Sequence, residues 1–219
     1  LFVICLMCAL AFLLWGSISL LTFLGIFLSL WVVLSSLWEI CKLLSQRSSE
    51  SYDLFKAFKI NRSLVGKSLA HAGFGALMFG ATAVSTWETE DVRYMKIGEE
   101  LKINGYIILF KEIEFQSQSN FKKVVGEFNI TIGDRLVGNL YPEKRFYISR
   151  QEVTTEAAIK PNFFDDVYIV LGNNINADEW VVKVYVKPFI SFIWLGVILI
   201  SLGSIMSLTS NRGKLKHPN

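Results

Sequence analysis

The chain has 219 residues, of which 52% are hydrophobic and only 19% are charged, and its mean hydropathy is +0.42. This composition is too apolar for an ordinary soluble domain and predicts several membrane spans. The net charge of +3 does not indicate a nucleic-acid partner, because it is unevenly distributed. Residues 87–187 carry 13 Lys and Arg against 16 Asp and Glu, whereas the rest of the chain carries 9 against 3.

The basic residues outside this acidic segment gather in Lys42–Lys67 and in the tail that starts at Arg212. Short basic segments beside hydrophobic spans remain on the cytoplasmic side of a membrane. The charge pattern therefore predicts that both basic segments are cytoplasmic and that the acidic segment lies outside.

Residues 1–42 are predicted to form one or two transmembrane helices, because no charge precedes Glu39 and a single span needs only ~20 residues. A break at Gly16-Ser17 would give a span over residues 1–16 and a second one from about Leu20 to Cys41. One long tilted helix is the alternative. Residues 43–62 are then a cytoplasmic loop.

Residues 63–87 form a further apolar run of spanning length, and it contains His71. Counting ~1.5 Å per residue, this histidine lies ~12 Å inside a hydrocarbon core ~30 Å thick. An ionisable side chain at that depth is costly and marks a candidate functional site.

Residues 88–187 differ from the rest of the chain, because apolar and polar residues alternate in short runs. The alternation is clearest in Val124–Ile132 and Trp180–Val186, and Asn104-Gly105 and Gly133-Asp134 are turn signals. Further β-rich runs are Tyr106–Phe115, Leu136–Tyr141, Glu152–Ile159 and Asp166–Leu171. This pattern predicts an external all-β domain, either a small antiparallel barrel or a sandwich.

Pro188 follows the last predicted strand, and residues 188–208 are predicted to be the final transmembrane helix. Gly196, Gly203 and Ser204 give this helix a small-residue face that suits close packing against another helix. Residues 209–219 form the predicted cytoplasmic tail. The predicted fold is thus a membrane α-helical protein of three or four spans with an inserted external all-β domain.

Three roles for His71 are open from the residues alone. The imidazole could hydrogen-bond a neighbouring helix, relay protons, or ligate a metal or haem iron. On a helical projection His71 shares its face with Ser68, Gly75, Met78 and Thr82. Most of these residues are small, which suits close helix packing as well as it suits clearance for a porphyrin.

Four blocks of the sequence resemble the cytochrome c maturation protein F family of haem lyases, and they occur in the same order. They are Ala70–Gly73 around His71, Tyr141–Tyr147 (YPEKRFY) followed by Thr155–Ile159, Asp166–Gly172, and Lys187–Gly196 at the start of the final span. The resemblance implies a polytopic membrane protein with a tryptophan-rich external haem-handling motif. It also implies two external histidines for delivered haem and two transmembrane histidines for a resident b-type haem.

Only His71 has a counterpart among those four histidines, as one axial ligand of haem b, and no tryptophan-rich segment occurs in the 219 residues. The chain begins at Leu1 and is apolar at once, without the basic start of a signal peptide. It therefore resembles the C-terminal portion of such a haem lyase, either truncated or encoded separately. Alone it is expected to lack the thioether-forming site and to be inactive.

The resemblance implies several partners and a location. The partners are the upstream part of the same haem lyase, the haem chaperone cytochrome c maturation protein E, apocytochrome c with its thioreductase subunit, and membrane lipid. The location is the bacterial inner membrane with the β domain on the periplasmic side, or the mitochondrial inner membrane for an organellar protein. Lys144 and Arg145 could pair with haem propionates or partner proteins, but an ion pair within the domain is the favoured role.

A second hypothesis comes from another class of protein. In it, the external β domain sits on a membrane anchor and serves assembly or sensing without a cofactor. A small transporter subunit is disfavoured, because His71 and Lys67 are too few ionisable groups for an ion pathway through the spans.

Overall fold

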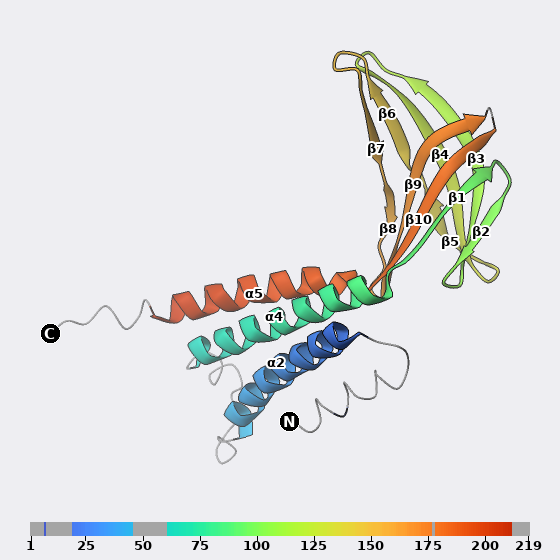
Figure 1. The fold of residues 1–219 in the computed structure, drawn as a ribbon. Coiled ribbons are helices and arrows are strands. Elements are labelled where there is room, and N and C mark those ends of the chain that lie inside the picture. Colours follow the sequence, from blue (N-terminus) through green and yellow to red (C-terminus); the bar gives the residue numbers. More distant parts are fainter. Residues whose placement is uncertain (1–6, 8–18, 46–60, 177, 212–219) are drawn as a thin grey trace. The chain divides into compact units, whose positions relative to one another are not determined.

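The structure is a computed structural model that describes residues 7, 19–45, 61–176 and 178–211. It divides into a helical unit, formed by the chain up to Thr86 and from Phe189 onward, and a β unit over Trp87–Pro188. Figure 1 shows the elements of both units. The predicted first span over residues 1–16, most of the loop over residues 43–62 and most of the tail lie outside the described residues.

The helical unit contains three helices that are long and apolar enough to cross a membrane in the part of the chain that the structure describes. They are α2 (Leu20–Ser45), α4 (Arg62–Trp87) and α5 (Ile190–Asn211). At ~1.5 Å per residue each is longer than a ~30 Å hydrocarbon core. The helical part of the predicted fold class is therefore confirmed.

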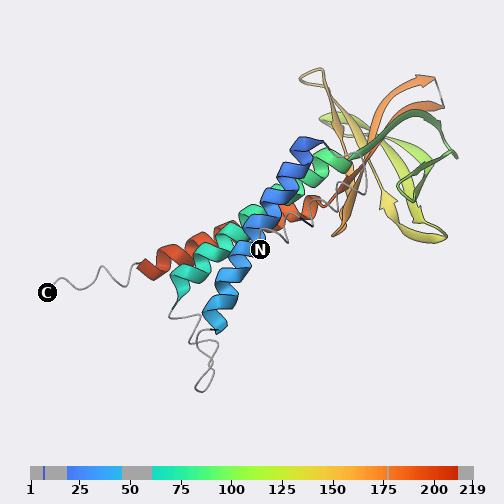
Figure 2. The ribbon, with the colours of Figure 1, turned by 60° about the horizontal axis from the view of Figure 1, so that its bottom comes forward.

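The interface between α4 and α5 is made by glycines spaced seven residues apart on α4. A Cβ atom built on Gly73 would lie 2.7 Å from the carbonyl oxygen of Gly196, and one built on Gly203 would lie 2.5 Å from that of Gly66. Gly80 continues the row against Ile193 of α5. Only glycine permits such a close approach of two backbones, as is common between membrane helices. Figure 2 shows α4 and α5 running side by side.

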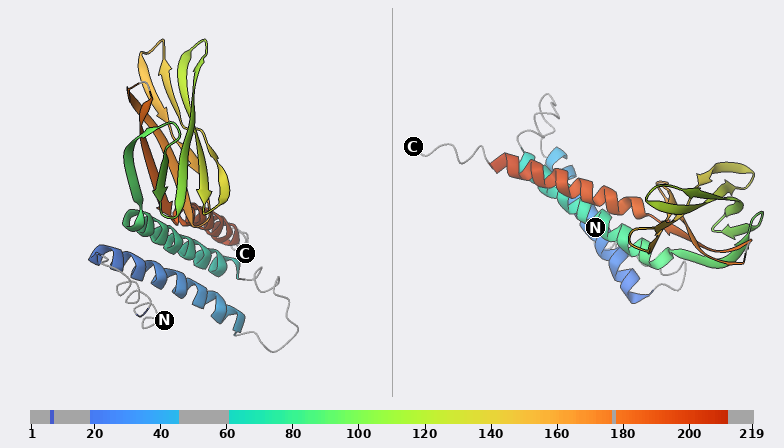
Figure 3. Two further views of the ribbon diagram at one scale, coloured as in Figure 1. Left: turned by 90° about the vertical axis from the view of Figure 1, so that its right-hand side faces the viewer. Right: turned by 90° about the horizontal axis from the view of Figure 1, so that it is seen from above.

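The opposite side of α4 packs against α2. A Cβ atom on Gly75 would lie 2.6 Å from Val33 Cγ2 and 3.0 Å from the carbonyl oxygen of Ser29, and Gly25 faces Thr82 in the same way. Helix α4 therefore lies between α2 and α5, as Figure 3 shows.

Two side-chain hydrogen bonds add to the contact between α2 and α4. The hydroxyl oxygens of Thr22 and Thr86 lie 3.0 Å apart, and Ser68 Oγ donates to Glu39 Oε2 at 2.8 Å. Because unsatisfied polar groups are costly in hydrocarbon, these pairs hold the two helices in one register.

The β unit consists of two sheets whose described strand pairs are all antiparallel. One sheet has the order β1-β10-β9-β8, and the other has β2-β3-β4-β6-β7 with β5 paired to β4. The strands are β1 (Thr89–Lys96), β2 (Glu100–Ile103), β3 (Tyr106–Ser117), β4 (Phe121–Ile132), β5 (Arg135–Leu140), β6 (Glu143–Tyr147), β7 (Glu152–Glu156), β8 (Ala158–Lys160), β9 (Asp165–Asn176) and β10 (Glu179–Pro188).

The core of the β unit contains residues from both sheets. Every second residue of β10 is buried, from Trp180 to Val186, and it packs with buried residues of β3, β4 and β9. Phe110 and Phe128 stack with ring centroids 4.6 Å apart and are fully buried. The alternation that predicts strands in the sequence thus also identifies the core face. The prediction of an all-β antiparallel domain is confirmed.

All six predicted β-rich runs fall on strands, and the run Glu152–Ile159 covers parts of two of them. The structure has two strands there, β7 in the larger sheet and β8 in the smaller one. Strands β1, β2 and β6 are missed, because charged residues dominate their sequences.

Candidate functional site in the membrane helices

His71 lies on α4, and its ring makes one hydrogen bond to the backbone of its own helix. Its Nδ1 atom is 2.8 Å from the carbonyl oxygen of Lys67, one turn earlier. A carbonyl oxygen can only accept, so Nδ1 carries the proton and donates. The lone pair of Nε2 is then available to a ligand, and the backbone hydrogen bond fixes the ring orientation, as is usual for metal-ligating histidines.

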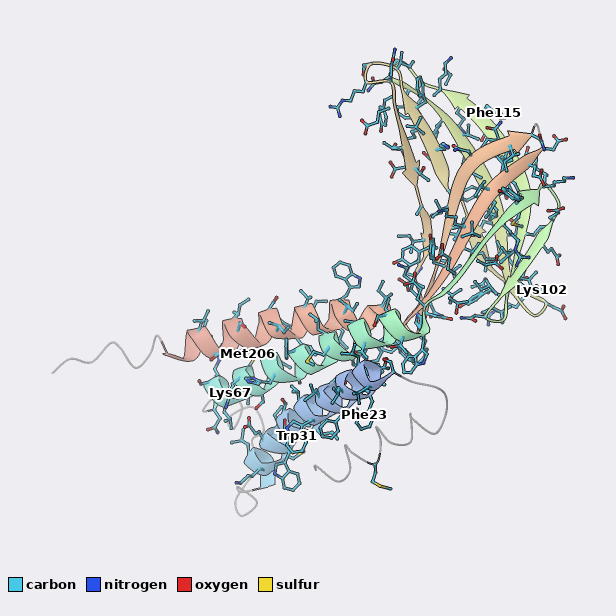
Figure 4. All side chains as sticks on the ribbon, in the orientation of Figure 1. Phe23, Trp31, Lys67, Lys102, Phe115 and Met206 are labelled. Carbon is cyan, nitrogen blue, oxygen red and sulfur yellow. The ribbon has the colours of Figure 1, made fainter. Side chains whose placement is uncertain are left out.

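The face of α4 that carries His71 is exposed among the described residues. We call it the open stripe; its exposed members are Lys67, His71, Phe74, Ala81 and Ser85. Their spacing of three, four or seven residues places them along one side of the helix. Figure 4 labels Lys67 near the start of α4.

Of the two uses left open for the small residues beside His71, helix packing is the one seen for Ser68, Gly75 and Thr82. Ser68 is hydrogen-bonded to Glu39, and the space beside Gly75 and Thr82 is taken up by α2. The helical projection places these three residues close to His71, but they belong to the face of α4 that packs against α2. Their small size therefore serves helix packing.

The hydrogen bond between Ser68 and Glu39 was not predicted from the sequence. Glu39 is the first charged residue of the chain and lies in a hydrophobic run, so its need for a partner was the available signal. Among the described residues, no three His, Cys, Asp or Glu side chains converge on a metal ion.

The β unit carries a cluster of charges on the outer face of β4, β6 and β7. Glu143 accepts from Lys123 at 2.8 Å and pairs with Arg145 at 2.8 Å, and Arg145 also lies 4.0 Å from Glu156. The hydrogen bond from Lys123, assisted by Arg145, lowers the pKa of Glu143. The predicted ion pair within the domain is confirmed for Arg145.

Lys144 does not join this cluster, because successive residues of a strand point to opposite faces. Its amine donates to Asn173 Oδ1, and the ion pairs of the described residues do not include it. Partial burial lowers the pKa of Lys144. The predicted ion pair is therefore wrong for Lys144 within the described chain.

Comparisons with known proteins agree with this architecture. Residues 86–188 match a family model described as the CcmF C-terminal β-sandwich. The cytochrome c-type biogenesis protein ccl1 of Rhodobacter capsulatus is 34% identical over 185 residues, which are 84% of this chain and 27% of that protein. The CcmF protein of Haemophilus influenzae is 30% identical over 206 residues, which are 93% of this chain and 31% of that protein.

A solved structure named cytochrome c haem lyase CcmF shares the fold with a TM-score of 0.74. The match covers 94% of this chain and 33% of that one at 14% identity. The chain thus spans less than a third of the length of the two curated relatives above.

Among the described residues, three helices long and apolar enough to cross a membrane flank an antiparallel β-sandwich in the sequence, which defines the class as a membrane protein with an inserted β domain. Sequence comparisons narrow this class to one family, whose members are named for cytochrome c-type biogenesis. The chain belongs to the CcmF, Ccl1 and CycK family and corresponds to its C-terminal region.

Proposed function

We propose that this chain is the C-terminal segment of a haem lyase for c-type cytochromes and that His71 supplies one axial ligand to a b-type haem in the membrane. The relatives are named for cytochrome c-type biogenesis, and the similar solved structure is named a haem lyase. Because the chain covers under a third of those two relatives, attachment of haem to apocytochrome c needs the upstream part of the protein.

The observation that carries the haem assignment is the geometry of His71. Its Nδ1 proton is held by the Lys67 carbonyl, so Nε2 is the atom left for iron. The residue lies on the open stripe rather than against α2 or α5. An imidazole that faced only lipid would be costly, whereas one that ligates a haem between α4 and an upstream helix has its polar atom satisfied.

A bound haem would supply one-electron chemistry at this position, and the protein's part is to hold it. Phe74 and Ala81 of the open stripe offer an apolar surface beside His71, and Phe74 is 52% exposed. The second axial histidine would come from an upstream helix, as the family resemblance implies. We place the β unit on the periplasmic side, where it would dock the haem chaperone, cytochrome c maturation protein E, and apocytochrome c with its thioreductase subunit.

The test is a visible spectrum of the chain assembled with its upstream part in membranes or detergent. The reduced wild-type assembly is expected to show the sharp α-band of a low-spin b-type haem. His71→Ala should reduce this band to background, since one of two axial ligands is removed. Ser85→Ala, on the same open stripe, is the matched control and should retain the band.

An unchanged bis-histidine spectrum in His71→Ala would refute the ligand assignment while leaving membership of the family intact. A colourless wild-type assembly would instead favour the hypothesis of a cofactor-free anchored β domain. The two outcomes are distinguished by the same measurement, provided that the protein yield of each variant is compared on gels.

A further inference from the structure

The register of β4 and β6 separates four neighbouring cations into two faces. In the strand register Lys123 lies opposite Arg145, and both side chains form ion pairs with Glu143 in the outer cluster. Lys122 is one residue before Lys123 and lies opposite Phe146 in the register. Its side chain therefore points to the other face of the sheet, which we call the inner face, together with that of Lys144. The inner face thus carries two lysines.

A cavity of about 640 Å³ opens on this inner face. It lies between β6, the C-terminal ends of β3 and β9, and the N-terminal ends of β4, β7 and β10. We call it the lysine cavity. Its volume is in the range of known ligand pockets. Its apolar walls include Phe115, Val124, Phe146, Val153 and Trp180.

Several of these apolar side chains are exposed to a degree that is unusual for their size. Phe115 is 73% exposed, Val153 52% and Phe146 40%. Figure 4 labels Phe115 near the end of β3. Exposed apolar groups that line one cavity indicate a surface that another molecule covers.

The charges around the lysine cavity favour an acidic molecule. Among the described residues, no carboxylate forms an ion pair with Lys122 or Lys144, and the partner of Lys144 is the neutral amide of Asn173. Water is partly removed from Lys144, which lowers its pKa. A carboxylate placed there would form a charge-assisted hydrogen bond in a partly dry site, where such bonds are strongest.

The strand beside the cavity also has a free hydrogen-bonding edge. β7 ends the six-stranded sheet, and in the described chain its only ladder partner is β6. Val153 and Thr155 of β7 are paired with Phe146 and Lys144. An added strand would therefore place alternate side chains over the lysine cavity, as in recognition by β-strand addition.

We propose that the lysine cavity binds an extended acidic segment of a partner protein, which adds as a strand to β7. One apolar side chain of that segment packs against Val153 and Phe146, and a carboxylate two positions along the strand accepts from Lys144. This inference rests on the proposed docking role of the β unit and names the site and the chemistry that it recognises.

The probe is a short fluorescent threonine peptide in which phenylalanine and glutamate stand at alternate positions, so that both project to the same face of a strand. Its anisotropy is measured with the full chain in detergent. Lys144→Gln should weaken binding about tenfold, the effect of one charge-assisted hydrogen bond. Lys102→Gln, at an exposed lysine of β2 outside the cavity, is the matched control and should bind as the wild type does.

A second peptide, with phenylalanine and glutamate adjacent, sends the two side chains to opposite faces and should bind more weakly. Equal binding of the two peptides, wild-type affinity in Lys144→Gln, or no binding of the first peptide would each overturn the proposal. Displacement of the peptide by benzoate at equal concentration would also overturn it, since a free carboxylate would then suffice. Phe146→Ala, which removes an exposed apolar wall of the cavity, provides a second variant in case Lys144→Gln fails to fold, and it should also weaken binding.

Failure of this inference is distinguishable from failure of the docking role. The purified haem chaperone is added to the same wild-type and Lys144→Gln proteins. If it binds both equally, the docking role stands and the lysine cavity is not the site. If it binds neither, the docking role itself is wrong.

Discussion

Glu143 and Lys144 are adjacent in sequence, yet the strand gives them opposite surroundings. Glu143 faces two cations on the outer surface, whereas Lys144 faces apolar side chains and an amide. His71 receives a third kind of partner, a backbone carbonyl of its own helix. For each residue the local geometry, rather than the residue type, determines which atoms are already hydrogen-bonded and which are available to bind a ligand.

The pairing of Glu143 leads to a prediction about pH. Because its pKa is lowered in the folded state, the unfolded state takes up the proton first as the pH falls. The stability that Glu143 contributes is therefore fully present above its ordinary pKa of 4.5 and is lost as the pH falls through the lowered value. Glu143→Gln should cost about 1 kcal/mol at neutral pH and progressively less in acid.

Urea unfolding at neutral pH and at about pH 3 would measure this difference. Glu100→Gln, at an exposed glutamate of β2, is the control and should change little at either pH. A loss in Glu143→Gln that is equally large in acid would contradict the assignment.

At the scale of elements, the glycine row of α4 is what brings α5 close. Gly196 and Gly203 of the small-residue face predicted for the last helix do lie at the interface. The glycines of α4 that face α5, Gly66, Gly73 and Gly80, were not predicted to form an interface. The prediction for this helix considered only the face that His71 shares with Ser68, Gly75, Met78 and Thr82. A helical projection gives angles but not which angle a neighbour occupies.

Gly73→Leu should separate α4 from α5, because even a Cβ atom there would lie 2.7 Å from Leu199 Cβ as well as from the Gly196 carbonyl oxygen. The melting temperature of the helical unit in detergent, followed by tryptophan emission, should fall by several degrees. Ala81→Leu is the control, since Ala81 lies on the open stripe and has room. An unchanged melting temperature in Gly73→Leu would mean that these backbones are not in contact.

The strands illustrate which elements a sequence reveals. β4 and β10 were predicted because one face of each is apolar and packs in the core. β6 was missed because its core side carries Lys144 and its other side carries charges as well, so no alternation in hydropathy exists. The feature that hid this strand is also the one that gives the lysine cavity its charge.

On the scale of the whole molecule, the chain consists of a helical unit and a β unit, and the buried cluster around Phe110 and Phe128 lies wholly within the β unit. Composition and hydropathy were enough to predict both kinds of structure. The way in which His71 is presented could not be predicted, since it depends on which faces of α4 the other two helices cover.

Because this core belongs to the β unit alone, Phe128→Ala should unfold that unit and leave the helices intact. Removing a fully buried phenylalanine costs about 3–5 kcal/mol. Circular dichroism should show loss of the strand signal at a lower temperature with the helical signal retained. Phe115→Ala, at a phenylalanine that is 73% exposed, should cost under about 1 kcal/mol. Simultaneous loss of both signals would mean that the two units unfold together.

The position of β10 has a consequence for biosynthesis. β10 lies between β1 and β9, and Thr89 at the start of the β unit is paired with Val186 near its end. The smaller sheet therefore lacks the strand that joins β1 to β9 until the ribosome has made almost the whole β unit. The strands of the larger sheet can pair before then, but β1 and β9 stay unpaired along the edges that β10 will join. The smaller sheet is completed only as the segment that becomes α5 is being synthesised.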